Sequence, residues 1–228
     1  MKKIINLICI LLVTITVNAQ RNVEKSVKVS KKQELYVHFK FANNIEVKQW
    51  NQNRIEVRAT VNLNNGEGNT HFSLKTSENG NQVKVYSDFG NYFKRKRNWN
   101  QHNTTEINYV VYVPKHANLT VKSISGSLEA ASYSGDLTTD LISGDITIKR
   151  YIGEMHLKTV SGDVDVAVSK AKINAKTVTG TIYSDLKIDK SYKENKSYSS
   201  KIRGTVNNGN VVLKMITVSG NIYMRKAK

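Results

Sequence analysis

The chain has 228 residues, of which 35 are Lys or Arg and 18 are Asp or Glu, so its formal net charge is +17 at neutral pH. Such an excess of cations favours polyanionic partners. The single cysteine, Cys9, lies in an N-terminal apolar run. Without that run the chain has no thiol, which excludes disulfides, thiolate metal sites and a cysteine nucleophile.

Residues 1–19 have the pattern of a secretory signal peptide. Lys2 and Lys3 precede an apolar run from Ile4 to Val17, and Val17-Asn18-Ala19 has the small residues of a cleavage site. We expect export to the periplasm, the cell surface or the extracellular space, with a mature chain that begins at Gln20 and no lipid-anchored cysteine. No later apolar segment is long enough to span a bilayer, so no transmembrane segment is expected in the mature chain.

Residues 20–115 are expected to form an N-terminal β region. Apolar and polar residues alternate with period two, as in half-buried strands, in the segments 27–29, 35–41, 45–47 and 55–61. Asn79-Gly80 predicts a hairpin turn between two further strands, and Pro114 is expected to end a strand. We expect this region to be antiparallel and to cap the open β edge of the repeats that follow.

A basic loop interrupts this region. It contains four consecutive cations between aromatic residues, and its candidate anion-binding residues are Lys94, Arg95, Lys96, Arg97 and Trp99. Clustered cations beside an aromatic ring can bind anionic ligands. The candidate partners are acidic polysaccharide, anionic lipid head groups or an envelope protein, while export argues against nucleic acid. The alternative is a loop whose charges only face solvent.

Residues 116–228 repeat, and glycine marks the period. It occurs every nine residues at positions 126, 135, 144, 153 and 162, is replaced by Ala171 and returns at Gly180. Alternate glycines have different neighbours, so the full repeat is 18 residues. A fixed period with alternating apolar residues predicts stacked β coils. We therefore expect an all-β chain whose residues 116–228 form a β-solenoid of about 18-residue coils, with glycine at the corners.

Residues 18 apart are expected to be neighbours on adjacent coils. The repeats are aligned on Gly126, Gly144, Gly162 and Gly180. The residues two positions before and two positions after these glycines are apolar and are expected to line the core: Ile124, Ile142, Val160 and Val178 before, and Leu128, Ile146, Val164 and Ile182 after. Val164 would then lie between Ile146 and Ile182, and Asp140 between Lys122 and Lys158. Residues 187–201 exceed the period and are expected to form an insertion.

No pattern in the sequence indicates catalysis, a metal or a cofactor. The five histidines are scattered, and no nucleophile elbow, phosphate loop or dinucleotide fingerprint occurs. Calcium-binding nonapeptide rolls need a Gly-Gly-x-Gly-x-Asp unit, whereas here the acid follows a single glycine. Asp140, Asp145, Asp163 and Asp165 could supply a carboxylate pair for glycoside hydrolysis, but they fall on repeat positions with neighbouring lysines. We expect a protein that is not an enzyme.

Three sets of residues resemble a known bacterial group: the segments 44–50 and 54–57, the segment 111–115, and the Ser-Gly-Asp triplets at 134–136, 143–145 and 161–163. Together they are similar to secreted adhesin-like domains of unknown function, which are related to the head-GIN adhesin-like domains. The resemblance covers most of the mature chain and implies an extracytoplasmic β-solenoid without known catalysis. Adhesin-like binding at the cell envelope is the leading expectation. A periplasmic envelope-stress or scaffolding component is the runner-up, and an enzyme acting on polysaccharide is third.

Overall fold

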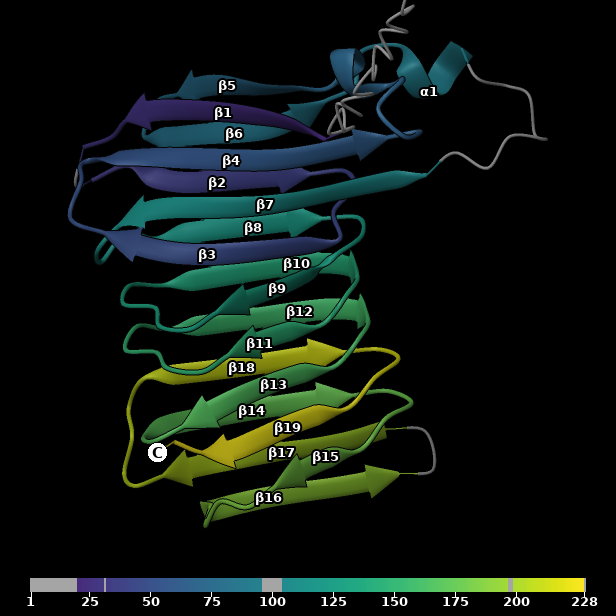
Figure 1. Ribbon diagram of the computed structural model, residues 1–228. Coiled ribbons are helices and arrows are strands. Elements are labelled where there is room, and N and C mark those ends of the chain that lie inside the picture. Colours follow the sequence, from purple (N-terminus) through teal and green to yellow (C-terminus); the bar gives the residue numbers. More distant parts are fainter. Residues whose placement is uncertain (1–19, 31, 96–103, 197–198, 228) are drawn as a thin grey trace, which may run out of the picture.

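The computed structural model describes residues 20–30, 32–95, 104–196 and 199–227, which form two β-sheets with a shared apolar core (Figure 1). Helical structure in these residues is confined to a one-turn helix, α1 (Tyr92–Arg95), and a 3-10 turn, η1 (Asn69–His71). The prediction of an all-β chain is confirmed.

Both sheets mix parallel and antiparallel pairs. The nine-stranded sheet has the order β1 (Arg21–Lys28), β4 (Arg54–Leu63), β7 (Thr105–Pro114), β3 (Asn44–Trp50), β9 (Ser127–Ala130), β11 (Ile146–Ile148), β13 (Val164–Val168), β19 (Ile222–Lys226), β15 (Ile182–Ser184). The ten-stranded sheet has the order β16 (Asp189–Lys196), β17 (Ser199–Val206), β14 (Ala171–Thr177), β18 (Val212–Thr217), β12 (Met155–Ser161), β10 (Leu137–Ser143), β8 (Leu119–Ser123), β2 (Glu34–Phe39), β6 (Gln82–Asp88), β5 (Ser73–Asn79).

The 18-residue period is visible in the strand register. In the ten-stranded sheet β8, β10 and β12 are parallel neighbours, with Leu119, Leu137 and Met155 opposite one another. In the nine-stranded sheet β9, β11 and β13 have the same 18-residue offset. Each coil therefore contributes one strand to each sheet, and the arrows of successive coils within one sheet point the same way in Figure 1. The fold is solenoid-like in this part, which we call the stack (residues 119–184 and 212–226).

The N-terminal strands are less uniform than expected. β5 and β6 form the predicted hairpin at Asn79-Gly80, and Pro114 is the last residue of β7, as expected. In contrast, β2 and β3 pair in parallel with β6 and β7 within this region, and with β8 and β9 at the first coil of the stack. The prediction of an antiparallel N-terminal region is therefore wrong for residues 34–50. These residues give one strand to each sheet and continue the stack.

The coils at the far end of the stack do not follow chain order. After β15, residues 189–206 form the hairpin β16–β17, and β17 pairs antiparallel with β14, so the predicted insertion extends the ten-stranded sheet. The chain then returns between earlier coils, with β18 between β12 and β14 and β19 between β13 and β15. Val164 therefore lies beside Ile222, and the predicted contact with Ile182 is wrong. An apolar β-branched residue fits beside Val164 from either coil, so the spacing alone does not identify the neighbour.

One of the two predicted core columns is on the surface. The side chains two positions before the corner glycine are exposed, at 41% for Ile124, 54% for Ile142 and 37% for Val160, and only Val178 of the predicted column is half-buried; Val218, at the same position of the returning coil, is 39% exposed. The residue before each of them is buried, and in three coils it is a threonine that donates a hydrogen bond to the carbonyl oxygen of a corner glycine: Thr159 to Gly144 at 2.9 Å, Thr217 to Gly162 at 2.9 Å and Thr177 to Gly220 at 2.7 Å. A buried carbonyl needs a donor, so the threonine faces inward and the Ile or Val faces solvent.

The acids that follow the glycines cap the backbone of the adjacent coil. The Asp163 N–H donates to Asp145 Oδ1 at 2.8 Å, and the Asn221 N–H donates to Asp163 Oδ1 at 2.6 Å. The Thr181 N–H donates to Asn221 Oδ1 at 3.0 Å. The Ser-Gly-Asp repeat is therefore explained by the corner itself, where glycine permits the turn and the next side chain satisfies a backbone donor.

Candidate anion-binding face

Strand alternation places every second residue of the ten-stranded sheet on its outer face. On β14 the residues Ala171, Ile173 and Ala175 are buried, while the lysines between and beside them are exposed. At the outward positions of β14, β17 and β18 we find five cations, here called the basic face: Lys172, Lys176, Lys201, Arg203 and Lys214.

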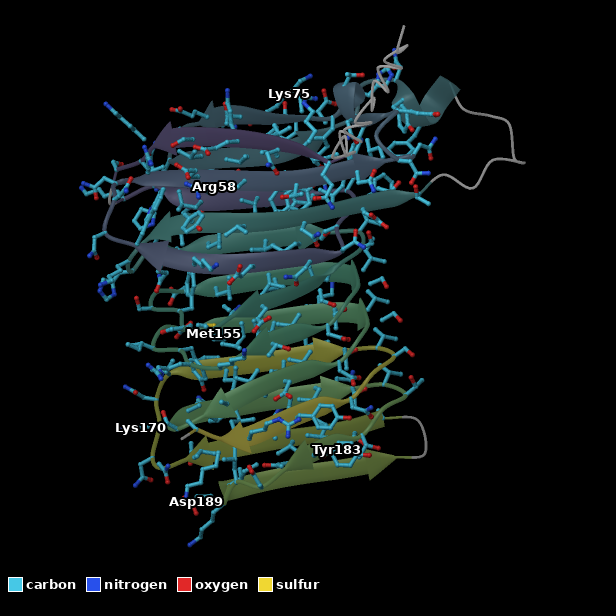
Figure 2. All side chains as sticks on the ribbon, viewed as in Figure 1. Arg58, Lys75, Met155, Lys170, Tyr183 and Asp189 are labelled. Atoms are coloured by element: carbon cyan, nitrogen blue, oxygen red, sulfur yellow. The ribbon has the colours of Figure 1, made fainter. Side chains whose placement is uncertain are left out.

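The register makes these cations neighbours. Lys176 pairs with Lys201 across β14 and β17, and Asn174 lies between Arg203 on β17 and Lys214 on β18. Adjacent strands are about 4.8 Å apart, so the charged groups lie within a Debye length of one another. Figure 2 places Lys170 and Asp189 at this end of the molecule, opposite to Lys75 and Arg58.

The charges of the basic face are not compensated by described side chains. None of the five cations forms an ion pair with a carboxylate that the structure describes. The neighbouring coils differ, because Asp140 lies 3.5 Å from Lys122 and 3.1 Å from Lys158, as the register predicted. Burial favours the protonated form of Asp140, but the two lysines outweigh it and hold the pKa of this carboxyl below its ordinary value. At β18 the outer face therefore changes from cations with a described ion pair to cations without one.

A shallow depression of about 520 Å³ lies within the basic face. Its polar lining consists of Lys172, Arg203, Asn174 and Thr205, and Val212 adds an apolar edge. An anion in this depression would meet two positive charges, an amide and a hydroxyl, and no carboxylate. These groups donate hydrogen bonds to carboxylates, sulfates or phosphates.

The predicted loop site is only partly within the described chain. Lys94 and Arg95 are the last two residues of α1, whereas Lys96, Arg97 and Trp99 lie outside the described residues. Tyr92, the aromatic residue at the start of α1, is 7% exposed, and its ring centroid is 5.0 Å from that of His71. The start of the loop is therefore anchored in an aromatic cluster, and its anion-binding role stays a prediction.

The four acids considered for glycoside hydrolysis each have a structural contact. Asp140 lies between two lysines, and Asp165 accepts the Nε–H of Arg225, which is shared between its two carboxylate oxygens at 2.8 Å each. Asp145 and Asp163 accept backbone N–H groups, as described above. Among the residues that the structure describes, no group of three or more His, Cys, Asp or Glu side chains is placed to hold a metal ion.

Sequence reasoning missed the basic face. The signal was present in the alternation Lys172-x-x-x-Lys176 and Lys201-x-Arg203, whose cations share one side of a strand. What the sequence did not reveal is that β17 and β18 flank β14. The charges of three segments therefore remained separate in the prediction, and the denser run at 94–97 was chosen instead.

Comparison with known families agrees with this architecture. The model of the Toastrack DUF4097 family matches residues 32–155 and 149–225. The chain belongs to the Toastrack DUF4097 family. The family prediction made from residues 44–57, 111–115 and the Ser-Gly-Asp triplets is confirmed. No curated protein matches the chain.

Solved structures with low sequence identity are similar to this chain to different degrees. A "putative cell adhesion protein" from Clostridium sporogenes has a TM-score of 0.57 at 11% identity, over 91% of this chain and 99% of that chain. A "putative adhesin" from Bacteroides fragilis has a TM-score of 0.30 at 10% identity, over 90% and 97% of the two chains. A "putative lipid binding protein" from Parabacteroides distasonis has a TM-score of 0.21 at 12% identity, over 90% and 97%. The first likeness shows the fold, and the two lower scores carry no argument. No helix in the described part of the chain is long and apolar enough to cross a membrane.

Proposed function

We propose that this chain is an exported β-solenoid protein that is not an enzyme and acts by adhesin-like binding, with an acidic polysaccharide bound along the basic face. The observation that carries the proposal is the group of five adjacent cations without a described acidic partner. A polyanion would interact with all five at once, and the general excess of Lys and Arg over Asp and Glu in the chain would favour its approach.

The shape of the basic face favours a chain over a compact ligand. The cations stand on three adjacent strands of a sheet, and the depression among them is open and shallow. A polysaccharide with regularly spaced carboxylates or sulfates can cross several strands and contact each cation in turn. Many weak charge contacts along one polymer add up, whereas a single small anion would meet only two of the cations.

Two further observations support binding outside the cytoplasm. The basic n-region, apolar run and small-residue site of residues 1–19 are those of an exported protein. The protein from Clostridium sporogenes with a similar fold is named a "putative cell adhesion protein". Within this proposal the loop at Lys94, Arg95, Lys96, Arg97 and Trp99 is a second anion-binding element.

A second candidate is the periplasmic scaffolding component, and the exposed apolar column favours it. Four apolar side chains lie in a row at the C-terminal ends of β8, β10, β12 and β18, and each is more than one third exposed: Ile124, Ile142, Val160 and Val218. Contiguous exposed apolar residues of this kind are typical of protein contacts. An envelope protein bound there would leave the basic face free.

The proposal is tested by removing the charge of the basic face. In the face variant Lys172, Lys176, Lys201, Arg203 and Lys214 are all replaced by Gln. We expect it to elute from an immobilised heparin or polygalacturonate column at much lower salt than the wild type. Binding of the wild type should weaken steeply with ionic strength, because exposed charges are screened by salt.

The matched control removes the same number of charges elsewhere. In the control variant the exposed cations Lys28, Lys32, Lys40, Arg150 and Lys226, which form no described ion pair, are replaced by Gln. It should elute close to the wild type. Equal losses in both variants would show that only net charge matters, and unchanged retention of a folded face variant would reject the proposal. If retention is lost only when the cations at 94–97 are replaced by Ser, the binding site is in the loop. If the protein binds anionic vesicles but neither polysaccharide, its partner is a lipid.

A further inference from the structure

A cavity of about 460 Å³ opens at the other end of the molecule, far from the basic face. Three connections line it: β1 to β2, β3 to β4, and β7 to β8. They lie at the left end of the upper part in Figure 1, where all three connections turn. The volume is in the range of small-molecule sites.

Hydrogen bonds between the three connections hold the cavity open. The Val29 N–H donates to the Asn53 carbonyl at 3.0 Å, and the Lys115 N–H donates to the Trp50 carbonyl at 3.1 Å. The Trp50 ring is fixed as well, because its Nε1–H donates to the Arg54 carbonyl at 3.0 Å and its ring stacks on Tyr112 with centroids 5.0 Å apart. A ligand would therefore enter a site that is already formed, which reduces the ordering cost of binding.

The base of the cavity is apolar and its rim is rich in amides. Leu35, Trp50 and Pro114 are among the apolar lining residues. The rim contains three consecutive amide side chains, Asn51, Gln52 and Asn53, which are exposed and make no described side-chain hydrogen bond. Lys115 and His116 add basic groups, and none of the described residues that line the cavity is acidic.

This lining selects among ligand classes. Among the described lining residues a metal ion or organic cation would find no carboxylate, and a phosphate would find one lysine. Side-chain amides both donate and accept hydrogen bonds, as sugar hydroxyls do, and an apolar base accommodates the C–H face of a pyranose. Lys115 can pair with a carboxylate on the same sugar.

We propose that this cavity binds a single pyranose unit that carries a carboxylate, as a uronic acid does. Asn51, Gln52 and Asn53 would contact its hydroxyl groups, Lys115 its carboxylate, and Pro114 its apolar face, while Trp50, whose ring packs against Tyr112 and Arg54, lies in the cavity wall and reports binding. The site is separate from the basic face, so it does not rest on the function proposed above.

The two tryptophans of the chain make the test direct. They are Trp50 and Trp99, so Trp99→Phe leaves Trp50 as the only indole. This protein is titrated with glucuronic acid, galacturonic acid, glucose and galactose, and Trp50 is followed by fluorescence and by its indole N–H signal in NMR spectra. We expect saturable shifts with at least one uronic acid, and binding roughly tenfold weaker for the matching neutral sugar, as for loss of one charge-assisted hydrogen bond.

Variants of the rim separate this site from nonspecific effects. Lys115→Gln should abolish the preference for the acid over the neutral sugar, and Asn51→Ala with Asn53→Ala should weaken both by roughly tenfold. Asn79→Ala, in the exposed turn between β5 and β6, is the matched amide control and should change nothing. Absence of any shift in both signals, or shifts unaffected by the rim variants, would overturn the proposal. A shift with an acidic peptide such as triglutamate but with no sugar would do the same and assign the cavity to peptides.

Discussion

In the N-terminal region, β1 to β7, aromatic rings fill much of the space between the two sheets, whereas the core of the stack is mainly aliphatic. Phe39 and Tyr109 stack with centroids 3.8 Å apart, and Phe72 contacts both Phe89 and Tyr109. In the stack, each coil instead adds mainly aliphatic residues from both sheets, such as Leu137 and Leu141 from the ten-stranded sheet and Ile146 and Ile148 from the nine-stranded sheet. Large rings need individual partners, while small branched side chains can repeat without change from coil to coil.

The two regions also treat charge differently. In the N-terminal region Glu56 is fully buried and lies 2.9 Å from Arg54 and 2.6 Å from Arg58. The ion pairs of the stack are exposed on its outer faces, as for Arg225 with Asp165. Beyond β12 the outer face has five cations that form no described ion pair. The comparison indicates that the N-terminal region is specified by unique side-chain contacts and the stack by rules that apply at each corner.

The largest expected effect concerns the core of the stack. Val164 is fully buried between Ile146 and Ile222, so Val164→Asp places an unpaired charge in the core and should destabilise by about 4 kcal/mol. Asp165→Asn, one residue further and facing outward, removes an exposed ion pair and should cost less than about 1 kcal/mol. Denaturant midpoints of the two variants test the assignment of faces. Similar midpoints would contradict it.

The fold of the stack is largely predictable from sequence because its rules are local. Glycine spacing and alternation suffice to place Leu119, Leu137 and Met155 in one column and to predict the pairing of Asp140 with two lysines. The return of β18 and β19 into the stack is not local. Leu213 fits between Met155 and Ile173 as a neighbouring coil would, and only the complete set of strand pairings shows where it goes.

The candidate sites were harder to predict for two physical reasons. The basic face combines cations from β14, β17 and β18, which become neighbours only through that nonlocal return. The exposed column was assigned to the core because apolar residues usually face inward. At the corners a buried glycine carbonyl needs a hydrogen-bond donor, so a threonine faces inward and the next apolar residue faces solvent. Thr159, which donates to the Gly144 carbonyl, and the exposed Val160 are an example. The cavity beside Trp50 requires three turns to meet, and no local pattern encodes that.

The next largest effect is expected when a glycine is replaced by alanine, which should cost more stability at a corner of the stack than in the N-terminal hairpin. Gly144 has a φ of 133°, and a Cβ there would overlap the Gly126 carbonyl of the adjacent coil, so Gly144→Ala should cost about 3 kcal/mol. Gly80, in the β5–β6 hairpin, has a φ of 56° but open space around it, and Gly80→Ala should cost about 1 kcal/mol. Thermal and denaturant unfolding of both variants measures the difference. Equal losses would mean that backbone conformation, and not coil contact, limits both sites.

A smaller effect is expected where an acid caps the next coil. Asp163→Ala removes the acceptor of the Asn221 N–H and should destabilise by about 1 kcal/mol, whereas Asp163→Asn keeps an oxygen at that position and should cost less. Thermal melts of both variants provide the measurement. Thermal melts of the wild type with calcium and with chelator should coincide, because Asp145 and Asp163 accept hydrogen bonds from backbone N–H groups. A rise of many degrees with calcium would instead support a metal-bound corner.

The smallest effect concerns His38, which is opposite Lys122 and Tyr86 in the ten-stranded sheet. Burial and then the charges of Lys84, Lys122 and Lys40 lower the pKa of His38 below its ordinary value of 6.5. The unfolded chain therefore takes up a proton at a higher pH than the folded protein does. The stability linked to His38 is present above about pH 6.5 and is lost as the pH falls through the folded-state pKa.

The measurement compares the wild type with His38→Gln at pH 7.5 and pH 5.5. The wild type should lose more stability between the two pH values, and the ring signals of His38 in NMR spectra should titrate below the ordinary range. Lys84→Gln removes one neighbouring charge and should raise the pKa of His38 toward its ordinary value. A pKa that does not move in this variant would attribute the shift to burial. The lysines at this end of the sheet would then act on His38 less strongly than their positions indicate.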